Sequence, residues 1–404
     1  MTTLRGRVLQ FEAGPHPKIW ISSSPVELRI PHLPPGLALG DWVEFSPMGL
    51  KILTPNRRND GRTPLFQRIQ DPRRKRGTEM RQRVELEIRS FFNQRGFLET
   101  RTPMLVACPG MEAHIRPFKL ETGAYLPTSP EFALKRLLVG GLEKIFQIAP
   151  AFRLEPKSNT HSPEFTLLEW YRAFAGMNEI MTDTEELIEQ LALKIRGEPA
   201  ISFQGRRFSV ARPWPRLFIR DLFREHAGFD WVQAQSVSQM TDHCHRLGLE
   251  TAKQDSWDDL YFRIWLNVIE PKLPQERAVF VYGYPPSQAA LSVIQQDPAG
   301  SRFARRFEAY AAGIELCNAF EELTDPSEQR ARFEKDMDLR QLQYGTSFPR
   351  TPLDEEFLTA LTEGMPPSGG NALGVDRLIM LLGDEPDIRY TFWLEPFDGT
   401  QPQG

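Results

Sequence analysis

Short apolar runs separated by turn residues characterise the first 56 residues of the chain. Eight prolines lie in this stretch, and prolines and glycines between apolar runs are turn signals. The runs have strand character and lie at residues 4–11, 18–22, 26–30, 41–45 and 50–53. We therefore predict a small antiparallel barrel or sandwich over residues 1–56, whose function the pattern leaves open.

Helical periodicity begins after a polar segment. Residues 57–78 are rich in arginine and predict a linker. Over residues 79–95 apolar side chains then recur at helical spacing, at Val84, Ile88, Phe91 and Phe92. Because Gly96 follows directly and glycine commonly terminates helices, we expect this helix to end there.

The remaining chain, to residue 404, mixes helical and strand patterns without regular βαβ alternation. Residues 179–195 predict a helix, residues 196–216 a loop or hairpin, and residues about 217–270 a helical insertion. We expect an α+β domain over residues 79–404, built around a largely antiparallel sheet flanked by helices.

Composition narrows the class of protein. The 404 residues are 40% hydrophobic and 25% charged, enough for one large core and a smaller one. The sequence lacks a run of eighteen apolar residues, and its first residues do not resemble a signal peptide, so we expect a cytoplasmic protein with no membrane association. Three widely spaced cysteines argue against a disulfide framework.

Charge is unevenly distributed. Residues 57–83 carry ten Lys or Arg and three Asp or Glu, a local balance of +7 within a chain of net charge −4. Such a stretch binds nucleic acid or an acidic protein, or is simply a solvated linker. The acidic remainder argues against an extended tRNA-binding surface, since phosphate contacts require clustered cations.

A carboxylate interrupts an apolar face in the predicted strand at residues 163–171. Period two places Phe165, Leu167, Glu169 and Tyr171 on one face. A buried carboxylate needs a positive partner. Either an internal arginine pairs with Glu169, or this face forms a pocket for an ammonium or guanidinium group, to which Tyr171 contributes its hydroxyl or ring.

Two arginines lie beside segments that suit phosphate binding. Arg153 precedes a polar loop at residues 156–162, and Arg377 opens a helix after the glycine-rich residues 369–374. A guanidinium at the positive end of a helix, beside a backbone that a ligand approaches closely, suits a polyphosphate. The alternative is that the glycine-rich segment is only a turn that connects two elements and binds no ligand.

Three glutamates recur at intervals of seven, at Glu308, Glu315 and Glu322, with Asn318 between the last two. Neighbouring carboxylates repel unless a cation lies between them, and Mg²⁺ carried by a nucleotide is a natural candidate. If residues 313–323 form one regular strand, Glu315 and Glu322 face opposite ways. Both reach one site only if a bulge or turn intervenes.

These blocks, in this order, resemble the three signature motifs of class II aminoacyl-tRNA synthetases, most closely the lysine branch. Residues 96–103 resemble motif 1, residues 152–171 motif 2 and residues 374–377 motif 3, within a similarity that covers roughly residues 75–390. Inside that branch the chain resembles the elongation factor P lysyltransferases, which are truncated paralogues of lysyl-tRNA synthetase. The blocks that carry this finer resemblance are residues 128–138, 163–171, 287–289, 313–325 and 372–377.

The resemblance implies a role for many of these residues. Arg153 and Arg377 are the implied catalytic residues, which hold the ATP phosphates. The implied ATP contacts are Arg153, Glu155, His161, Phe165, Glu315 and Arg377, and the implied Mg²⁺ ligands are Glu308 and Glu315. The implied lysine contacts are Ser129, Glu131, Glu169, Tyr171, Asn318, Glu322 and Ala372. Ala372 is informative because true lysyl-tRNA synthetases carry glycine at the matching position.

The activity implied is ATP-dependent formation of a lysyl or β-lysyl adenylate, followed by transfer to a lysine side chain of elongation factor P. The resemblance also implies a homodimer formed through the motif 1 residues 97–103. A lysyl-tRNA synthetase with a reduced anticodon domain is the first alternative, supported by the basic linker. A catalytically silent regulatory module is the second. Leu154 and Pro156 depart from the usual motif 2 residues, so that loop is expected to meet a different partner surface.

Overall fold

The computed structural model describes residues 3–23, 27–56, 68, 70–112, 114–345 and 350–396, without the side chains of residues 343 and 344. The chain forms two compact units, Met1–Thr78 and Glu79–Gly404. In the described residues, none of the helices is long and apolar enough to cross a membrane.

The first unit is an antiparallel sheet of five strands in the order β3-β2-β1-β4-β5. The strands are β1 Leu4–Glu12, β2 Lys18–Ile21, β3 Leu28–Arg29, β4 Trp42–Ser46 and β5 Gly49–Thr54. Five aliphatic side chains are buried together in its core, namely Val8, Ile19, Ile21, Ile30 and Val43. The predicted short antiparallel strands are confirmed; Val26, which we placed in the third strand, lies outside the described residues.

Helix α2, Pro72–Gln94, confirms the predicted helix but begins earlier than expected. Residues 72–78 were predicted to be linker and are helical instead, because proline is well tolerated in the first turn of a helix and arginine is a good helix former. Gly96 follows the helix with a φ of +75°, a conformation that favours glycine. Most of the predicted linker, residues 57–67 and 69, lies outside the described part of the chain.

The second unit is built on one large sheet in the order β11-β12-β14-β15-β16-β8-β7-β6, with β13 paired to β14. Its strands pair antiparallel except for β11 with β12 and β6 with β7. This confirms the predicted α+β domain. The strands are β6 Leu98–Glu99, β7 Lys144–Phe152, β8 Glu164–Ala173, β11 Arg216–Phe218, β12 Val279–Tyr284, β13 Ile294–Gln296, β14 Arg302–Ala311, β15 Ile314–Glu321 and β16 Ser368–Gly374.

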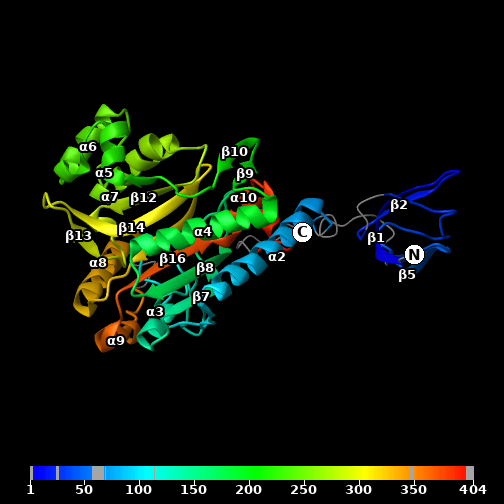
Figure 1. Cartoon of the computed structure of the whole chain (residues 1–404), viewed down its shortest axis with the longest axis horizontal. Helices are drawn as coiled ribbons and strands as arrows, with labels where there is room; N and C mark the ends of the chain where they lie inside the picture. Colours follow the sequence, from blue (N-terminus) through cyan, green and yellow to red (C-terminus); the bar gives the residue numbers. More distant parts are fainter. Residues whose placement is uncertain are drawn as a thin grey trace. The chain divides into compact units, whose positions relative to one another are not determined.

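Helices cover both faces of this sheet. Three helices, α2, α4 Met177–Arg196 and α10 Val375–Gly383, share a core with Leu168 and Trp170 of β8. Three others, α3 Glu131–Val139, α8 Pro326–Tyr344 and α9 Glu355–Gly364, share a core with Tyr171 on the opposite face. Figure 1 shows α4 crossing the sheet, with α3 and α9 side by side below it.

The predicted hairpin and insertion follow α4. Strands β9 Ala200–Phe203 and β10 Arg206–Ser209 pair as a two-stranded sheet. The insertion then contains α5 Ile219–Leu222, α6 Val237–Arg246 and α7 Trp257–Ile264, gathered around their own buried cluster. Figure 1 shows these helices together at one end of the large sheet.

Candidate active site

Directly paired residues form a row across five strands of the large sheet. Glu308 of β14 pairs with Asn318 of β15, which pairs with Ala372 of β16. Ala372 in turn pairs with Glu169 of β8, and Glu169 with Gln147 of β7. Because directly opposed residues of antiparallel strands point to the same side, all five side chains face the same way. This row is the floor of the candidate site.

Glu169 is fully buried on this floor and bonds to hydroxyl groups. The Ser129 hydroxyl donates to Glu169 Oε1 at 2.6 Å, and the Tyr171 hydroxyl donates to Oε2 at 3.1 Å. Burial, and then the nearby Glu131 carboxylate, raise the pKa of Glu169 to about 8. Among the described residues, no arginine pairs with Glu169, so that alternative is not supported.

Two further carboxylates flank a buried lysine that the sequence did not single out. The Nζ of Lys135 lies 2.5 Å from Glu131 Oε1 and 2.5 Å from Glu322 Oε2. Lys135 is completely buried. Burial alone would lower its pKa, but the two carboxylates raise it to about 12, so the side chain stays charged.

Glu322 retains unused hydrogen-bonding capacity. Among the described residues neither of its carboxylate oxygens has a hydrogen-bond partner of good geometry, although Lys135 forms an ion pair with it. Burial raises the pKa of Glu322 to about 8, against the opposing effect of Lys135. A Cβ on Gly370 would lie 2.2 Å from the Tyr171 ring and 2.5 Å from Glu322 Oε1. The glycine therefore makes room for these two side chains.

A cavity of about 430 Å³ adjoins this pocket. Ser129 and Glu131 contribute to its wall, together with Cys108, Glu112 and Asp354. Its lining does not include Glu169 or Glu322, although Glu169 accepts a hydrogen bond from the lining residue Ser129. Glu131 and Ser129 thus connect the buried carboxylates to a small ligand-sized space.

Arginine and histidine gather to one side of the row, where β7 ends, β8 begins and β16 leads into α10. The guanidinium of Arg153 lies 5.1 Å from the centre of the Phe165 ring. One terminal nitrogen of Arg377 lies 2.9 Å from His161 Nε2, and the other donates to the Glu315 carbonyl at 2.8 Å. Burial, and then Arg377, lower the pKa of His161. Glu155 is half-buried nearby and raises that pKa.

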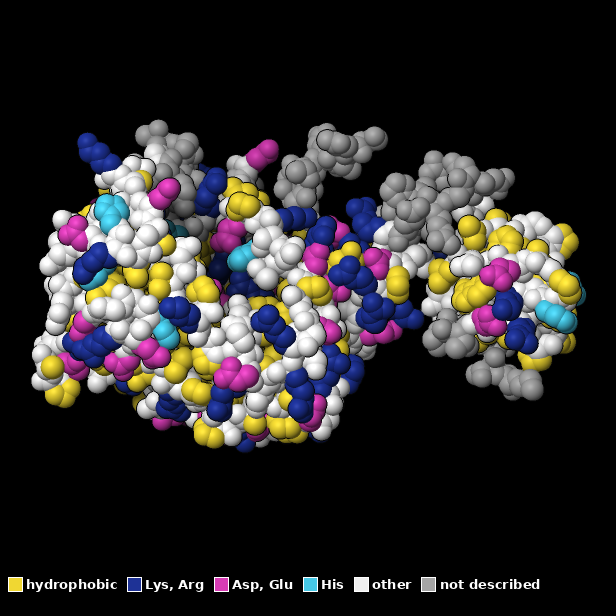
Figure 2. Space-filling model, turned by 90° about the horizontal axis from the view of Figure 1, so that it is seen from above, with side chains coloured by type: hydrophobic (Ala, Val, Ile, Leu, Met, Phe, Trp, Pro, Cys, Tyr) yellow, Lys and Arg dark blue, Asp and Glu magenta, His cyan; other side chains and the backbone are white. Residues whose placement is uncertain are grey.

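Figure 2 shows a hollow on one face of the second unit with Lys or Arg side chains deep within it. A recess lined by cations attracts anions, because low-dielectric walls concentrate the field. This end of the site therefore suits a phosphate-bearing ligand.

A β-bulge brings Glu315 to the same side of the sheet as Glu308. Tyr310 pairs with Glu315 while Ala309 pairs with Cys317, so Leu316 is an extra residue in β15. A bulge or turn of this kind was the condition under which Glu315 and Glu322 could both reach one site. Burial, and then the Glu308 carboxylate, raise the pKa of Glu315 to about 7, with Arg377 opposing them.

The three glutamates spaced by seven do not form one cluster. Glu322 joins Lys135, whereas Glu308 contacts Arg306 at 2.5 Å and accepts from the Tyr310 hydroxyl at 2.7 Å. The described residues contain no group of three or more His, Cys, Asp or Glu placed to hold a metal. Two neighbouring carboxylates nevertheless suit Mg²⁺ that arrives with a nucleotide, since Mg²⁺ commonly takes one or two carboxylates and completes its shell with phosphate and water.

The glycine-rich segment before Arg377 differs from its prediction. We expected a turn that approaches a ligand, but residues 368–374 form strand β16. A Cβ on Gly369 would meet the Ile180 side chain at 2.5 Å, so this glycine also accommodates packing within the protein. Arg377 does lie in the first turn of the following helix, α10, as predicted.

Sequence reasoning missed two cations of the site, the buried Lys135 and the half-buried Arg306. Arg306 donates to Asn318 Oδ1 at 2.9 Å and to the Gln288 carbonyl at 3.1 Å. Each lies on the same element as a glutamate that the sequence analysis named, at a spacing that places the two side chains on one face. Lys135 is four residues after Glu131 on a helix, and Arg306 is two residues before Glu308 on a strand.

Comparison with known proteins places this geometry in a family. Residues 63–394 match the family model described as tRNA synthetases class II (D, K and N). A lysine-tRNA ligase of Pelotomaculum thermopropionicum is 38% identical over 329 residues, 80% of this chain and 63% of that protein. The lysine-tRNA ligases of Syntrophomonas wolfei and Staphylococcus aureus are 38% and 35% identical over 314 residues each, 76% of this chain and 62% of each relative.

The chain spans about three-fifths of the length of these relatives. The family match nonetheless covers most of the chain, including both ends of the row on the large sheet. The chain therefore belongs to the class II aminoacyl-tRNA synthetases of the aspartate, lysine and asparagine group.

Proposed function

We propose that this protein is an ATP-dependent ligase that activates lysine or β-lysine as an aminoacyl adenylate. The observation that carries the proposal is a charge imbalance: among the described residues, three buried carboxylates, Glu131, Glu169 and Glu322, lie around one buried cation, Lys135. Unpaired buried charge is costly, so the pocket favours a ligand that brings two positive charges. Lysine and β-lysine each carry two ammonium groups.

Each ammonium group has a candidate partner. Glu131 lines the cavity and would receive the α- or β-amine. Glu322 pairs with Lys135 through Oε2 and would use Oε1 to receive the side-chain ammonium, together with Glu169 and Tyr171. Asn318 and Ala372 form the floor beside Glu169, and Ser129 fixes the Glu169 carboxylate. Removing either ligand charge would leave a buried carboxylate unpaired.

The cationic end would hold ATP. Phe165 offers a ring to the adenine, Arg153 and Arg377 would bind phosphate oxygens, and His161 and Glu155 lie beside the same space. The substrate carboxylate attacks the α-phosphorus in line, the bond from that phosphorus to the bridging oxygen breaks, and pyrophosphate leaves with the electron pair. The protein contributes by positioning the reactants and by stabilising phosphoryl charge.

Glu308 and Glu315 would hold Mg²⁺. The bulge in β15 brings these two carboxylates to one side of the sheet, where the Glu308 carboxylate disfavours the ionised form of Glu315. Bound Mg²⁺ would relieve that repulsion and supply positive charge to the phosphates. The residues present therefore fit the metal that the family resemblance implies.

The sequence favours elongation factor P over tRNA as the acceptor of the activated lysine, whereas the comparisons favour tRNA. The curated relatives are named lysine-tRNA ligases, which supports tRNA as the acceptor. Elongation factor P is the second candidate. The observation in its favour is Ala372, which lies in the floor between Asn318 and Glu169 where tRNA ligases carry glycine by resemblance.

The acceptor is decided by incubating the full chain with ATP and labelled lysine or β-lysine, then offering purified tRNA and elongation factor P in parallel. Label on tRNA supports the first candidate, and label on elongation factor P the second. Release of AMP without label on either would show that the acceptor is a different molecule.

We also propose that the protein is a homodimer joined through the motif 1 segment. Strand β6 ends the order of the large sheet, and Leu98 within it and Leu105 shortly after it are 54% and 63% exposed. Large exposed apolar side chains on an edge strand favour association. Light scattering at micromolar concentration should give about twice the chain mass; a mass near 46.4 kDa would contradict this.

A further inference from the structure

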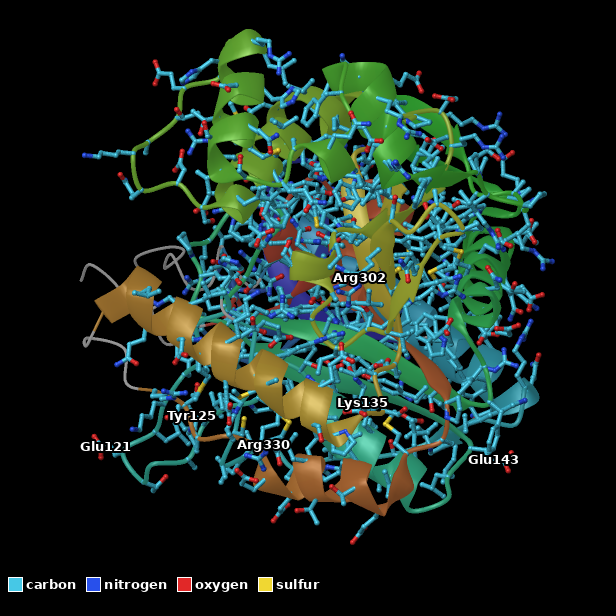
Figure 3. The ribbon with its side chains drawn as sticks, turned by 90° about the vertical axis from the view of Figure 1, so that its left-hand side faces the viewer. Glu121, Tyr125, Lys135, Glu143, Arg302 and Arg330 are labelled. Atoms are coloured by element: carbon cyan, nitrogen blue, oxygen red, sulfur yellow. The ribbon has the colours of Figure 1, made fainter. Side chains whose placement is uncertain are left out.

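Lys135 is the buried cation of the amino-acid pocket, and the family resemblance assigned it no role. It lies on α3, four residues after Glu131, where α3 meets α9. Figure 3 shows its side chain enclosed near α8 and α9. Its Nζ lies 5.9 Å from the centre of the Phe357 ring, so an aromatic side chain also lies close to the ammonium.

The charged and titratable groups around Lys135 come from several elements. Glu131 belongs to α3 itself, Glu322 follows β15, and Glu169 and Tyr171 belong to β8. Glu112 and Arg153 act on Glu131 from the loop before α3 and from the end of β7. Only Glu131 and Glu322 lie within ion-pair distance of the Lys135 ammonium among the described residues.

The two contacted carboxylates come from separate elements, and the ammonium lies between them. Without it, Glu131 and Glu322 would face each other in a dry environment, where one would take up a proton or both would move apart. A buried lysine is itself expensive, and an apolar side chain of similar volume would stabilise a core as well or better. A buried ammonium at this position therefore suits a site in which the two carboxylates must be held in place and must ionise readily.

We propose that Lys135 is a positioning residue that holds Glu131 and Glu322 apart and favours their ionised forms, so that one carboxylate meets each amine of the substrate. Lys135 also sets the charge that an amino acid must bring, because it neutralises one of three carboxylates and leaves two for the ligand. This inference rests on the proposed activation of lysine. It adds a specificity-determining residue that does not touch the substrate.

The test replaces Lys135 by methionine, which has a similar length and no charge. We expect the KM for lysine in ATP-pyrophosphate exchange to rise at least about tenfold, with the KM for ATP unchanged. The acidic limb of kcat/KM for lysine should move to higher pH by about one unit or more, because an opposite charge at this distance lowers a carboxyl pKa by about 1 to 3 units. A role in folding alone would not move that limb.

The matched control is Lys194→Met, at an exposed lysine in the last turn of α4. This variant removes the same charge and should match the wild type in both KM values and in pH profile. Thermal melting with and without ATP shows whether each variant is folded.

A second variant, Lys135→Arg, tests the proposal if Lys135→Met does not fold. Arginine retains the charge, so the acidic limb should stay in place, while its larger head displaces the two carboxylates and raises the KM for lysine. A folded Lys135→Met with an unshifted limb, or a Lys135→Arg with wild-type KM, would overturn the role of Lys135 while leaving lysine activation intact. A wild-type protein that shows neither exchange nor binding with lysine would overturn both.

Discussion

The proposed amino-acid end and nucleotide end of the site, both on the large sheet, differ in charge and in enclosure. At the amino-acid end, Glu131, Glu169 and Glu322 outnumber the single cation Lys135, and Glu169 and Glu322 are almost completely buried. At the nucleotide end, the Arg153 and Arg377 guanidinium groups lie half-buried beside His161. One sheet thus presents a negative pocket and a positive recess, which suits the joining of a dication to a polyanion.

Under the proposed function, the amino-acid end selects the substrate by its charge, and the nucleotide end stabilises the charge on the phosphates. A closed anionic pocket penalises any ligand that lacks two positive charges, because the penalty for an unpaired buried carboxylate is large. A more open cationic recess tolerates several orientations of phosphate and binds more weakly per contact. Changes at the first end should therefore have larger and more specific effects than changes at the second.

The largest effect is expected at Glu169. Glu169→Gln removes a charge that would meet the side-chain ammonium, which costs about 2 to 5 kcal/mol, a loss of about thirtyfold or more in lysine-dependent exchange. ATP binding should be nearly unchanged, since the proposed nucleotide contacts lie elsewhere on the sheet. Exchange kinetics and ATP binding measured on the same folded variant check this, and near-normal exchange would remove Glu169 from the pocket.

A smaller effect is expected at Arg377. Arg377→Ala removes hydrogen bonds to phosphate oxygens, each worth about 1.5 to 3 kcal/mol, so the KM for ATP should rise about tenfold to hundredfold. Binding of lysine alone should persist. Calorimetric titration with lysine separates the two ends, and a variant that loses lysine binding together with ATP would show that the ends are not independent.

The pH dependence of stability should distinguish the empty pocket from the filled one. Burial raises the pKa of Glu169 and Glu322 to about 8, from an ordinary 4.5. Between these values the folded protein holds protons that the unfolded chain has released, so its free energy of unfolding should fall as pH rises from about 5 to about 8. Lysine supplies the missing cations and should oppose this fall.

Thermal melts across this pH range, with and without saturating lysine, check the prediction. The gain in Tm from lysine should grow as pH rises towards about 8, because binding then costs fewer protons. A gain that is the same at every pH would show that Glu169 and Glu322 are already ionised in the empty pocket.

The smallest effect on activation is expected from the first unit. All proposed ATP and lysine contacts lie in the second unit, so deleting residues 1–56 should change adenylate formation less than about twofold while weakening transfer to the acceptor. The basic segment at residues 57–83 would steer an acidic partner, and this effect should shrink as salt rises. Loss of exchange and transfer together would show that the first unit instead supports folding.

Local pattern predicted the parts of the site that depend on a single element. Period two along β8 placed Glu169 and Tyr171 together, and the buried core on the far side contains Leu168 and Trp170. The spacing of Glu315 and Glu322 required an irregular strand if both were to reach one site; β15 does contain a bulge, but the two glutamates lie in different clusters. In both cases the deciding information lies within about ten consecutive residues.

Other features depend on tertiary placement and could not be predicted. Lys135 lies at an ordinary helical spacing from Glu131, and only the fold brings Glu322 to its other side. The glycines of β16 looked like a turn because glycine is rare in strands, yet Gly369 and Gly370 are needed there for the close packing of neighbouring side chains. The helical start of α2 was hidden because an arginine-rich segment after a proline reads as linker.

The central claim is that two excess carboxylates select an amino acid with two ammonium groups. The most direct test is ATP-pyrophosphate exchange by the full chain with lysine and with norleucine, which has the same α-amine and a side chain of similar length without the terminal ammonium. The account predicts exchange with lysine and, at equal concentration, at least about a hundredfold less with norleucine, because a buried carboxylate would be left unpaired. Comparable exchange with the two amino acids, or none with lysine, would contradict it.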